Sequence, residues 1–245
     1  MEDESIIKLE DRIILALDDW EFVYECINFL DKLSRTPYAV KIHSLWDKQG
    51  SVAVEQLKWF TNRIFVDLKL KDIPRTVGVR AKIAKEVGVD FLTVFADGGV
   101  EMMRAAVENG PEIIAVTVLT SLSSKEVQCI YGGEQATVVA TRFAMFAKES
   151  GIKYIVCSSQ EVSCLSEMPQ LAGMEFWVPG IRQTGESSDD QTRFDTPSAA
   201  IKSGATRLVI GSSITKARDP KKAFDEISSE IESALSKINA KEVKI

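Results

Sequence analysis

Short apolar runs of β type recur along the chain, and the stretch from one run to the next leaves room for a helix. We expect eight strands, at residues 13–18, 38–43, 64–68, 90–95, 113–118, 154–157, 175–178 and 207–210. Between them lie stretches with the 3.6-residue apolar spacing of helices, for example residues 76–87, 100–109, 137–150 and 197–203. Glycines mark helix ends just before the next strand: Gly88, Gly110, Gly151 and Gly204.

This alternation predicts parallel strands joined by crossover helices. Eight such units in 245 residues favour a closed (β/α)8 TIM barrel over an open sheet. No linker or low-complexity stretch divides the chain, so we expect a single catalytic domain over residues 1–245. Within it, residues 220–245 are predicted to form a charged C-terminal helix with a solvated outer face.

Composition narrows the class of protein. The net charge of −6 argues against a nucleic-acid partner. No apolar run reaches the ~20 residues of a membrane-spanning helix, and the acidic start does not resemble a signal peptide, so we expect a cytoplasmic protein. The four cysteines form no CxxC pair and are interpreted as free thiols. His43 is the one histidine, and we expect a structural or packing role for it rather than a catalytic one.

Polar residues gather at the carboxyl ends of the predicted strands, which is where barrels of this type place their active sites. They are Asp18, Lys41, Asp67, Lys69, Asp97, Thr120, residues 179–182 and residues 211–215. Surface charge scattered at random would not collect at one end of a barrel. The pattern therefore predicts a site at the mouth.

The segment around Asp67 carries the candidate chemistry. Strand side chains alternate between faces, so Asp67 and Lys69 are predicted to point the same way. With Lys41 and Asp72 they form an array in which opposite charges keep each other ionised. Lys69 could protonate a carbon that gains negative charge, and Asp67 would repel a bound carboxylate, a repulsion that loss of carbon dioxide relieves. The alternative is a structural ion-pair network.

The loops after the seventh and eighth strands favour phosphate recognition. Arg182 could form paired hydrogen bonds with phosphate oxygens, and backbone N–H groups near Gly211 could hold them. The polar stretch 182–193 could act as a mobile lid that brings Gln191 to the ligand. A plain surface loop is the alternative.

These residues give the chain a resemblance, over nearly its whole length, to the orotidine 5'-phosphate decarboxylase family. The matching segments are residues 15–18 (LALD), the strand with Lys41, residues 67–69 (DLK), 71–74 (KDIP) and 76–77 (TV), 98–99 (GG) with Met102 and Met103, 117–121 (TVLTS), 179–182 (PGIR), Asp190, Gln191 and Arg193, 196–197 (TP) and 219–220 (DP). The DxKxxDIP pattern is typical of the wider superfamily, and its combination with TVLTS and PGIR favours the decarboxylase.

The resemblance implies decarboxylation of orotidine 5'-phosphate to uridine 5'-phosphate in de novo pyrimidine biosynthesis, with no metal or organic cofactor. It implies that Lys69 protonates C6 of the pyrimidine and that Asp67 lies against the departing carboxylate. Lys41 and Asp72 would complete the array, with Asp72 supplied by the partner subunit of a homodimer.

The resemblance also implies how the rest of the substrate is held. The ribose hydroxyls would contact Asp18, Lys41 and Thr76, the last from the partner subunit. Thr120 would contact the pyrimidine edge and Pro179 would line its apolar pocket. Arg182 and Gln191, with the Gly211–Ser212 turn, would bind the phosphate.

One departure from the family pattern concerns the phosphate. The family usually has an arginine directly after the glycine of the eighth strand, and here that position is Ser212. A serine hydroxyl supplies neither the charge nor the paired donors of an arginine. Arg193, Lys216 and Arg218 are the candidates to replace it.

Two other departures lie elsewhere. The fourth strand ends in FADGG rather than the usual HAxGG, and Lys71 and Arg75 add positive charge beside Asp72.

Two alternative hypotheses about the function stay open. One is a superfamily sibling that acts on a sugar phosphate with a metal ion, of the hexulose-phosphate synthase or keto-gulonate-phosphate decarboxylase type. The other is a degenerate homologue that only binds a nucleotide, which Ser212 favours.

Overall fold

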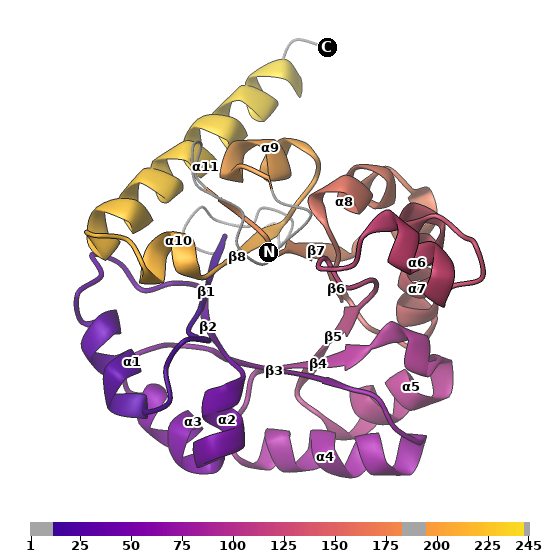
Figure 1. Cartoon of the computed structure of the whole chain (residues 1–245), viewed down its shortest axis with the longest axis horizontal. Helices are drawn as coiled ribbons and strands as arrows, with labels where there is room; N and C mark the ends of the chain where they lie inside the picture. The colour runs from indigo at the N-terminus through magenta and orange to yellow at the C-terminus, as the bar shows by residue number, and fades with distance from the viewer. Residues whose placement is uncertain (1–11, 183–194, 243–245) are drawn as a thin grey trace, which may run out of the picture.

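Eight parallel strands close into a barrel in the computed structural model, which describes residues 12–182 and 195–242 (Figure 1). Each strand pairs with the next in sequence, and the last pairs with the first. The strands are β1 (Ile13–Ala16), β2 (Ala39–Ile42), β3 (Ile64–Leu70), β4 (Phe91–Phe95), β5 (Glu112–Val116), β6 (Tyr154–Val156), β7 (Glu175–Val178) and β8 (Arg207–Ile210). The predicted TIM barrel is confirmed.

Helices form the outer ring around the strands (Figure 1). They are α1 (Val23–Leu30), α2 (Ser44–Gln49), α3 (Ser51–Leu57), α4 (Pro74–Glu86), α5 (Val100–Asn109), α6 (Ser124–Ile130), α7 (Ala136–Glu149), α8 (Ser159–Ser166), α9 (Pro197–Lys202), α10 (Ser212–Thr215) and α11 (Pro220–Glu242), with 3₁₀ turns η2 (Ala96–Gly98) and η3 (Pro169–Leu171). The helix predicted at 100–109 is confirmed to the residue. The helices predicted at 76–87, 137–150 and 197–203 have bounds that differ from the prediction by one or two residues. Helix α4 starts early because Pro74 occupies its first turn.

Helix α11 forms the predicted charged C-terminal helix, and its inner face packs against the rest of the barrel. It buries Phe224, Ile227 and Ile231, whose spacing places them on one helical face, and it packs against α9. Among its described side chains, the exposed charges lie on the opposite face. The helix is therefore part of the packed outer layer.

Strand ends differ from the predicted bounds where the chain leaves the sheet for the barrel mouth. The first and fifth strands end two residues early, at Ala16 and Val116. The third runs two residues longer than predicted, to Leu70, with a register shift against β4. That irregular end of β3 carries the residues from which the site is built.

The inside of the barrel is filled by an aromatic layer. Trp177 is fully buried, with its ring centroid 4.9 Å from that of Phe91 and 5.6 Å from that of Phe65. The Arg207 guanidinium lies 4.0 Å from the centroid of the Tyr38 ring. These groups close the barrel beneath its mouth, so that a cavity can open only above them.

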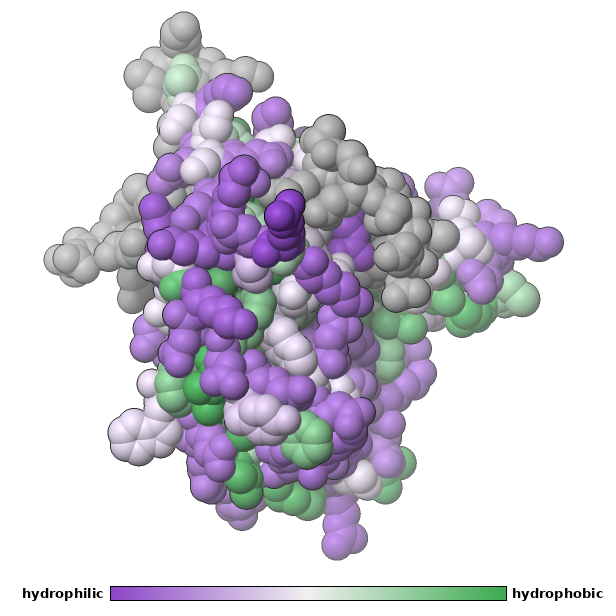
Figure 2. Space-filling model, turned by 60° about the vertical axis from the view of Figure 1, so that its left-hand side comes forward, coloured by the Kyte–Doolittle hydropathy of each residue, from purple (hydrophilic) through white to green (hydrophobic). Residues whose placement is uncertain are grey.

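The outer surface is mainly hydrophilic on the face shown in Figure 2, where apolar residues form small patches between polar ones. The large apolar residues exposed on the described part of the chain include Trp59, Ile73, Val79 and Ile83. No helix within residues 12–182 and 195–242 combines the length and apolarity needed to cross a bilayer.

The aromatic layer makes a stability prediction. Trp177→Ala should lower the free energy of unfolding by about 3–5 kcal/mol, because it leaves a cavity among packed rings. The matched control is Trp59→Ala: that side chain is 86% exposed, and its loss should change stability by no more than about 0.5 kcal/mol. Urea unfolding followed by circular dichroism measures both. Equal losses in the two variants would contradict the role given to Trp177.

Candidate active site

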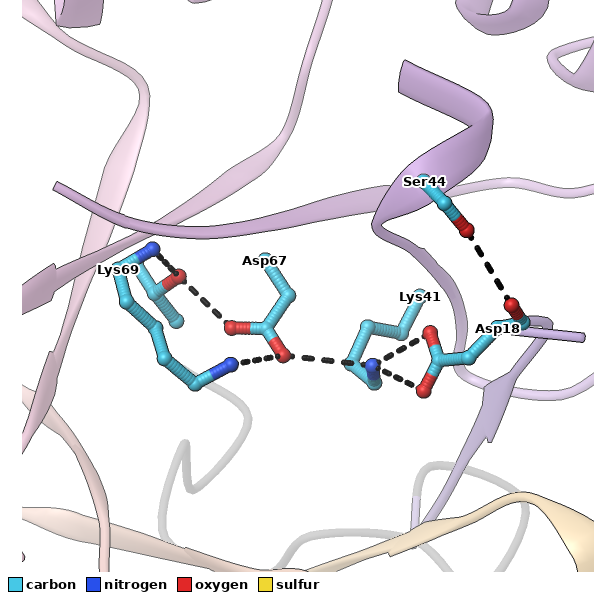
Figure 3. A network of polar contacts seen from close by, with 6 residues as sticks. Asp18, Lys41, Ser44, Asp67 and Lys69 are labelled. Atoms are coloured by element: carbon cyan, nitrogen blue, oxygen red, sulfur yellow. Dashed lines mark hydrogen bonds and ion pairs between the residues drawn. The ribbon is translucent and has the colours of Figure 1, made fainter. Parts of the chain in front are cut away.

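Four charged side chains of alternating sign lie in a row at the barrel mouth (Figure 3). Lys41 Nζ is 2.7 Å from both carboxylate oxygens of Asp18 and 3.3 Å from Oδ2 of Asp67. The same Oδ2 accepts a hydrogen bond from Lys69 Nζ at 2.8 Å. The Asp67 carboxylate is thus shared between two ammonium groups.

Strand periodicity explains why these side chains meet. Ala39 and Phe65 pack inside the barrel, and Lys41 and Asp67 each lie two residues further along the same strand, so they face inward one layer higher. Asp18 follows β1 at the mouth, where its backbone oxygen accepts a hydrogen bond from Ser44 Oγ at 3.3 Å. The predicted proximity of the acid and the two bases is present in the structure.

The centre of the row is buried, with Lys41 7% and Asp67 8% exposed. Burial by itself would raise the pKa of Asp67, but the charges of Lys41 and Lys69, with hydrogen bonds from Lys69 and Thr93, lower it to about 2. Burial likewise opposes the charge of Lys41, yet the carboxylates of Asp67 and Asp18 raise its pKa above the ordinary value. Both groups therefore stay charged at neutral pH.

Thr93 is a site residue that sequence reasoning missed. Its hydroxyl accepts a hydrogen bond from the backbone N–H of Lys69 at 2.8 Å and donates one to Asp67 Oδ1 at 2.9 Å. Lys69 has a φ of 47°, the only positive φ outside glycine in the described residues. The sequence pattern could have indicated this residue, because Thr93 is the one polar residue of its strand and lies two positions after the inward-facing Phe91.

A cavity of about 370 Å³ opens above the aromatic layer, within the size range of small-molecule sites. The charged row forms part of its wall, and much of the remainder is apolar. The lining residues are Ala16, Asp18, Asp19, Lys41, Phe65, Asp67, Lys69, Val116, Val118, Leu119, Thr120, Val156, Pro179, Gly180, Ile181, Arg182, Val209, Gly211, Ser212 and Lys216. Thr120, Pro179, Arg182, Gly211 and Ser212 are thus brought to one site, as predicted.

Cationic groups lie at the β7–β8 part of the cavity, across the ring from β3 in Figure 1. An Arg182 guanidinium nitrogen donates a hydrogen bond to Ser212 Oγ, and Lys216 Nζ is 3.4 Å from a carboxylate oxygen of Asp19. Of the candidates to replace the missing arginine, Lys216 lines the cavity and Arg218 does not. Arg193 and the predicted ligand Gln191 lie outside the described residues.

Two predicted residues do not reach this cavity. Asp72 is exposed and accepts a hydrogen bond from the N–H of Ile73 at 2.6 Å. Thr76 is half-buried in the first turn of α4. Neither is among the described residues that line the cavity, so within one chain the array consists of Asp18, Lys41, Asp67 and Lys69.

Other predicted features lie outside the site. Asp97 pairs with Lys71 at 2.7 Å rather than with the charged row. His43 is exposed at the start of α2, so the packing role expected for it is wrong. In the part of the chain that the structure describes, no three His, Cys, Asp or Glu side chains gather as a metal ion would require.

Comparisons with known proteins agree with this geometry. The model of the orotidine 5'-phosphate decarboxylase / HUMPS family matches residues 11–227. An orotidine 5'-phosphate decarboxylase of Saccharophagus degradans is 37% identical over 90% of this chain and 94% of its own length. One from Moorella thermoacetica is 38% identical over 91% and 93%.

A solved structure extends the match to three dimensions. The orotidine 5'-phosphate decarboxylase of Lactobacillus acidophilus superimposes with a TM-score of 0.75 at 30% identity, covering 90% of this chain and 98% of that one. With a family model that spans most of the chain and relatives above one-third identity, the chain belongs to the orotidine 5'-phosphate decarboxylase / HUMPS family.

Proposed function

We propose that this chain is a carboxy-lyase that converts orotidine 5'-phosphate to uridine 5'-phosphate and carbon dioxide in de novo pyrimidine biosynthesis. The observation that carries the proposal is the row Asp18–Lys41–Asp67–Lys69 on the wall of a cavity whose other end is cationic. A substrate with a carboxylate at one end and a phosphate at the other matches both ends. The relatives bear the name of this activity.

The cavity suggests how the substrate lies. The pyrimidine ring would sit against Pro179 with its polar edge at Thr120, and the ribose hydroxyls would meet Asp18 and Lys41. The phosphate would then reach the β7–β8 loops. There Arg182 supplies paired N–H donors, with Gln191 as a further ligand in this proposal.

The charged row supplies the chemistry at C6. The bond from C6 to the carboxylate breaks, carbon dioxide leaves, and the electron pair of that bond remains on C6. The Lys69 ammonium donates a proton to C6 and later regains one from solvent. Asp67 places a negative charge beside the departing carboxylate and holds Lys69 Nζ at 2.8 Å. Placed charges thus stabilise the carbanion, and in this proposal no metal or organic cofactor takes part.

Asp72 and Thr76 act, in this proposal, in the site of a second copy of the chain. They lie at the start of α4, outside the cavity of their own chain. The same helix region exposes Ile73, Val79 and Ile83, which are 64%, 55% and 48% exposed. Apolar surface of this kind is suited to a subunit interface, so we propose a homodimer that completes each array with a partner aspartate.

Lys216 takes over, in this proposal, the phosphate contact that the family assigns to an arginine at position 212. Its side chain is 66% exposed at the cavity mouth, where it can turn from Asp19 toward an incoming anion. Ser212 already accepts a hydrogen bond from Arg182 and so orients that guanidinium.

We also propose a cytoplasmic location, since all four cysteines are free thiols, as is usual in a reducing compartment.

The first prediction concerns activity. Purified protein treated with a chelator should consume orotidine 5'-phosphate, seen as loss of the orotate absorbance. Lys69→Ala should lower kcat by roughly 10²- to 10⁴-fold, the usual effect of losing a general acid, while uridine 5'-phosphate still binds by calorimetry. Lys153→Ala, an exposed lysine at the other end of the barrel, is the control. No turnover by the parent protein would refute the function, and a requirement for added magnesium would favour the metal-dependent siblings.

The second prediction concerns the shared site. Lys69→Ala and Asp72→Ala homodimers should each be nearly inactive. A purified hybrid of the two should regain roughly half the parent activity, because a twofold dimer then has one site in which both residues are intact. The hybrid of Lys69→Ala with Asp67→Ala should stay inactive. Lys69 and Asp67 both serve the site of their own chain, so each of the two sites in this hybrid lacks one of them. A Lys69–Asp72 hybrid as inactive as this control would contradict the exchange of Asp72.

The third prediction concerns the phosphate. Lys216→Ala should raise KM roughly tenfold, the effect of one charge-assisted hydrogen bond of about 1.5 kcal/mol. Ser212→Arg in that background should restore much of the affinity. Lys153→Ala again controls for the change in net charge. If Lys216→Ala leaves KM unchanged, another group binds the phosphate.

A further inference from the structure

We propose that Thr93 is a positioning residue for the reaction: its hydroxyl fixes the relative placement of Asp67 and Lys69. The proposal rests on the proposed function, because it assigns Thr93 a part in the decarboxylation step. Thr93 is not among the residues that line the cavity, and it acts through two that are, Asp67 and Lys69.

The argument begins with the register of β3 and β4. Val66 pairs with Leu92 and Leu70 pairs with Val94. Between these paired positions β3 has three residues, 67–69, and β4 has one, Thr93. The strand therefore bulges by two residues, and Thr93 is the residue that faces the bulge.

The bulge places both functional side chains at the cavity. Lys69 adopts a left-handed φ of 47°, a conformation that side chains with a Cβ rarely take. Its N–H is directed to Thr93 Oγ1, 2.8 Å away. Because Thr93 is fully buried on a strand of the barrel wall, this hydrogen bond anchors the strained segment to a rigid neighbour.

The hydroxyl also orients Asp67. A threonine hydroxyl has one proton, and since its oxygen accepts from Lys69, that proton goes to Asp67 Oδ1 at 2.9 Å. Oδ2 is then the oxygen that faces both ammonium groups, at 2.8 Å from Lys69 and 3.3 Å from Lys41. One buried group thereby sets the carboxylate plane and the backbone of the proton donor together.

Two substitutions separate the hydroxyl from the shape of the side chain. Thr93→Val keeps the branched shape and removes the hydroxyl; Thr93→Ser keeps the hydroxyl. We expect Thr93→Val to lower kcat by roughly 10- to 100-fold with KM changed less than about threefold, because misplacement of reacting groups costs rate rather than binding. Thr93→Ser should stay within about threefold of the parent.

Thr206→Val is the matched control. It removes a threonine hydroxyl that bonds the Phe176 carbonyl at 2.9 Å, at the opposite end of the barrel from the charged row. It should leave kcat unchanged. A kcat in Thr93→Val within twofold of the parent, or an equal loss in Thr93→Ser, would overturn the proposal, as would an equal loss of kcat in Thr206→Val.

A second measurement does not depend on turnover. Loss of the hydrogen bond from Thr93 should raise the pKa of Asp67, which ¹³C NMR of the labelled carboxyl detects in the folded protein. Thr93→Val should show this rise, and Thr93→Ser and Thr206→Val should not. If the parent protein fails to decarboxylate the substrate, the proposed function fails, whereas an unchanged Asp67 titration in Thr93→Val refutes the positioning role alone.

Discussion

The sharing of one buried carboxylate between two lysines is the interaction on which the site depends. Asp67 is nearly excluded from water, and a charge in that position is costly unless it is compensated. Lys41 and Lys69 supply the compensation, and each of them depends on Asp67 in turn. The row extends to Asp18, so it carries two positive and two negative charges and can be buried without net charge.

The barrel makes this row possible by layering its interior. An aromatic layer around Trp177 fills the lower part, and inward-facing residues two positions further along the strands form the charged layer above it. The lower layer gives stability, and it also leaves the row accessible only from the mouth. The aromatic layer low in the barrel thus provides stability, and the charged layer higher on the same strands forms the site.

The row is not made by regular strand geometry alone. In a regular strand, Asp67 and Lys69 would face inward on successive layers about 7 Å apart along the strand. In the structure this stretch bulges opposite Thr93, Lys69 has a left-handed backbone, and its ammonium lies 2.8 Å from the carboxylate. Backbone strain of this kind is stored where the surrounding structure compensates it. The same segment continues to Asp72, which is exposed and does not line the cavity of its own chain.

The amino-acid sequence by itself determined the barrel, because eight apolar runs separated by helical patterns leave few other topologies. It also determined that Lys41 and Asp67 face one site, since their places at the ends of neighbouring strands fix their direction. A period of two predicted the same direction for Lys69, but the structure brings Lys69 there through the bulge opposite Thr93. The sequence did not reveal Thr93 as their anchor, the exposure of Asp72, or the position of Lys216 at the cavity. Those depend on how β3 is registered against β4 and how separate loops meet in space. Register and loop contacts arise between segments far apart in the chain, so only the tertiary structure decided them.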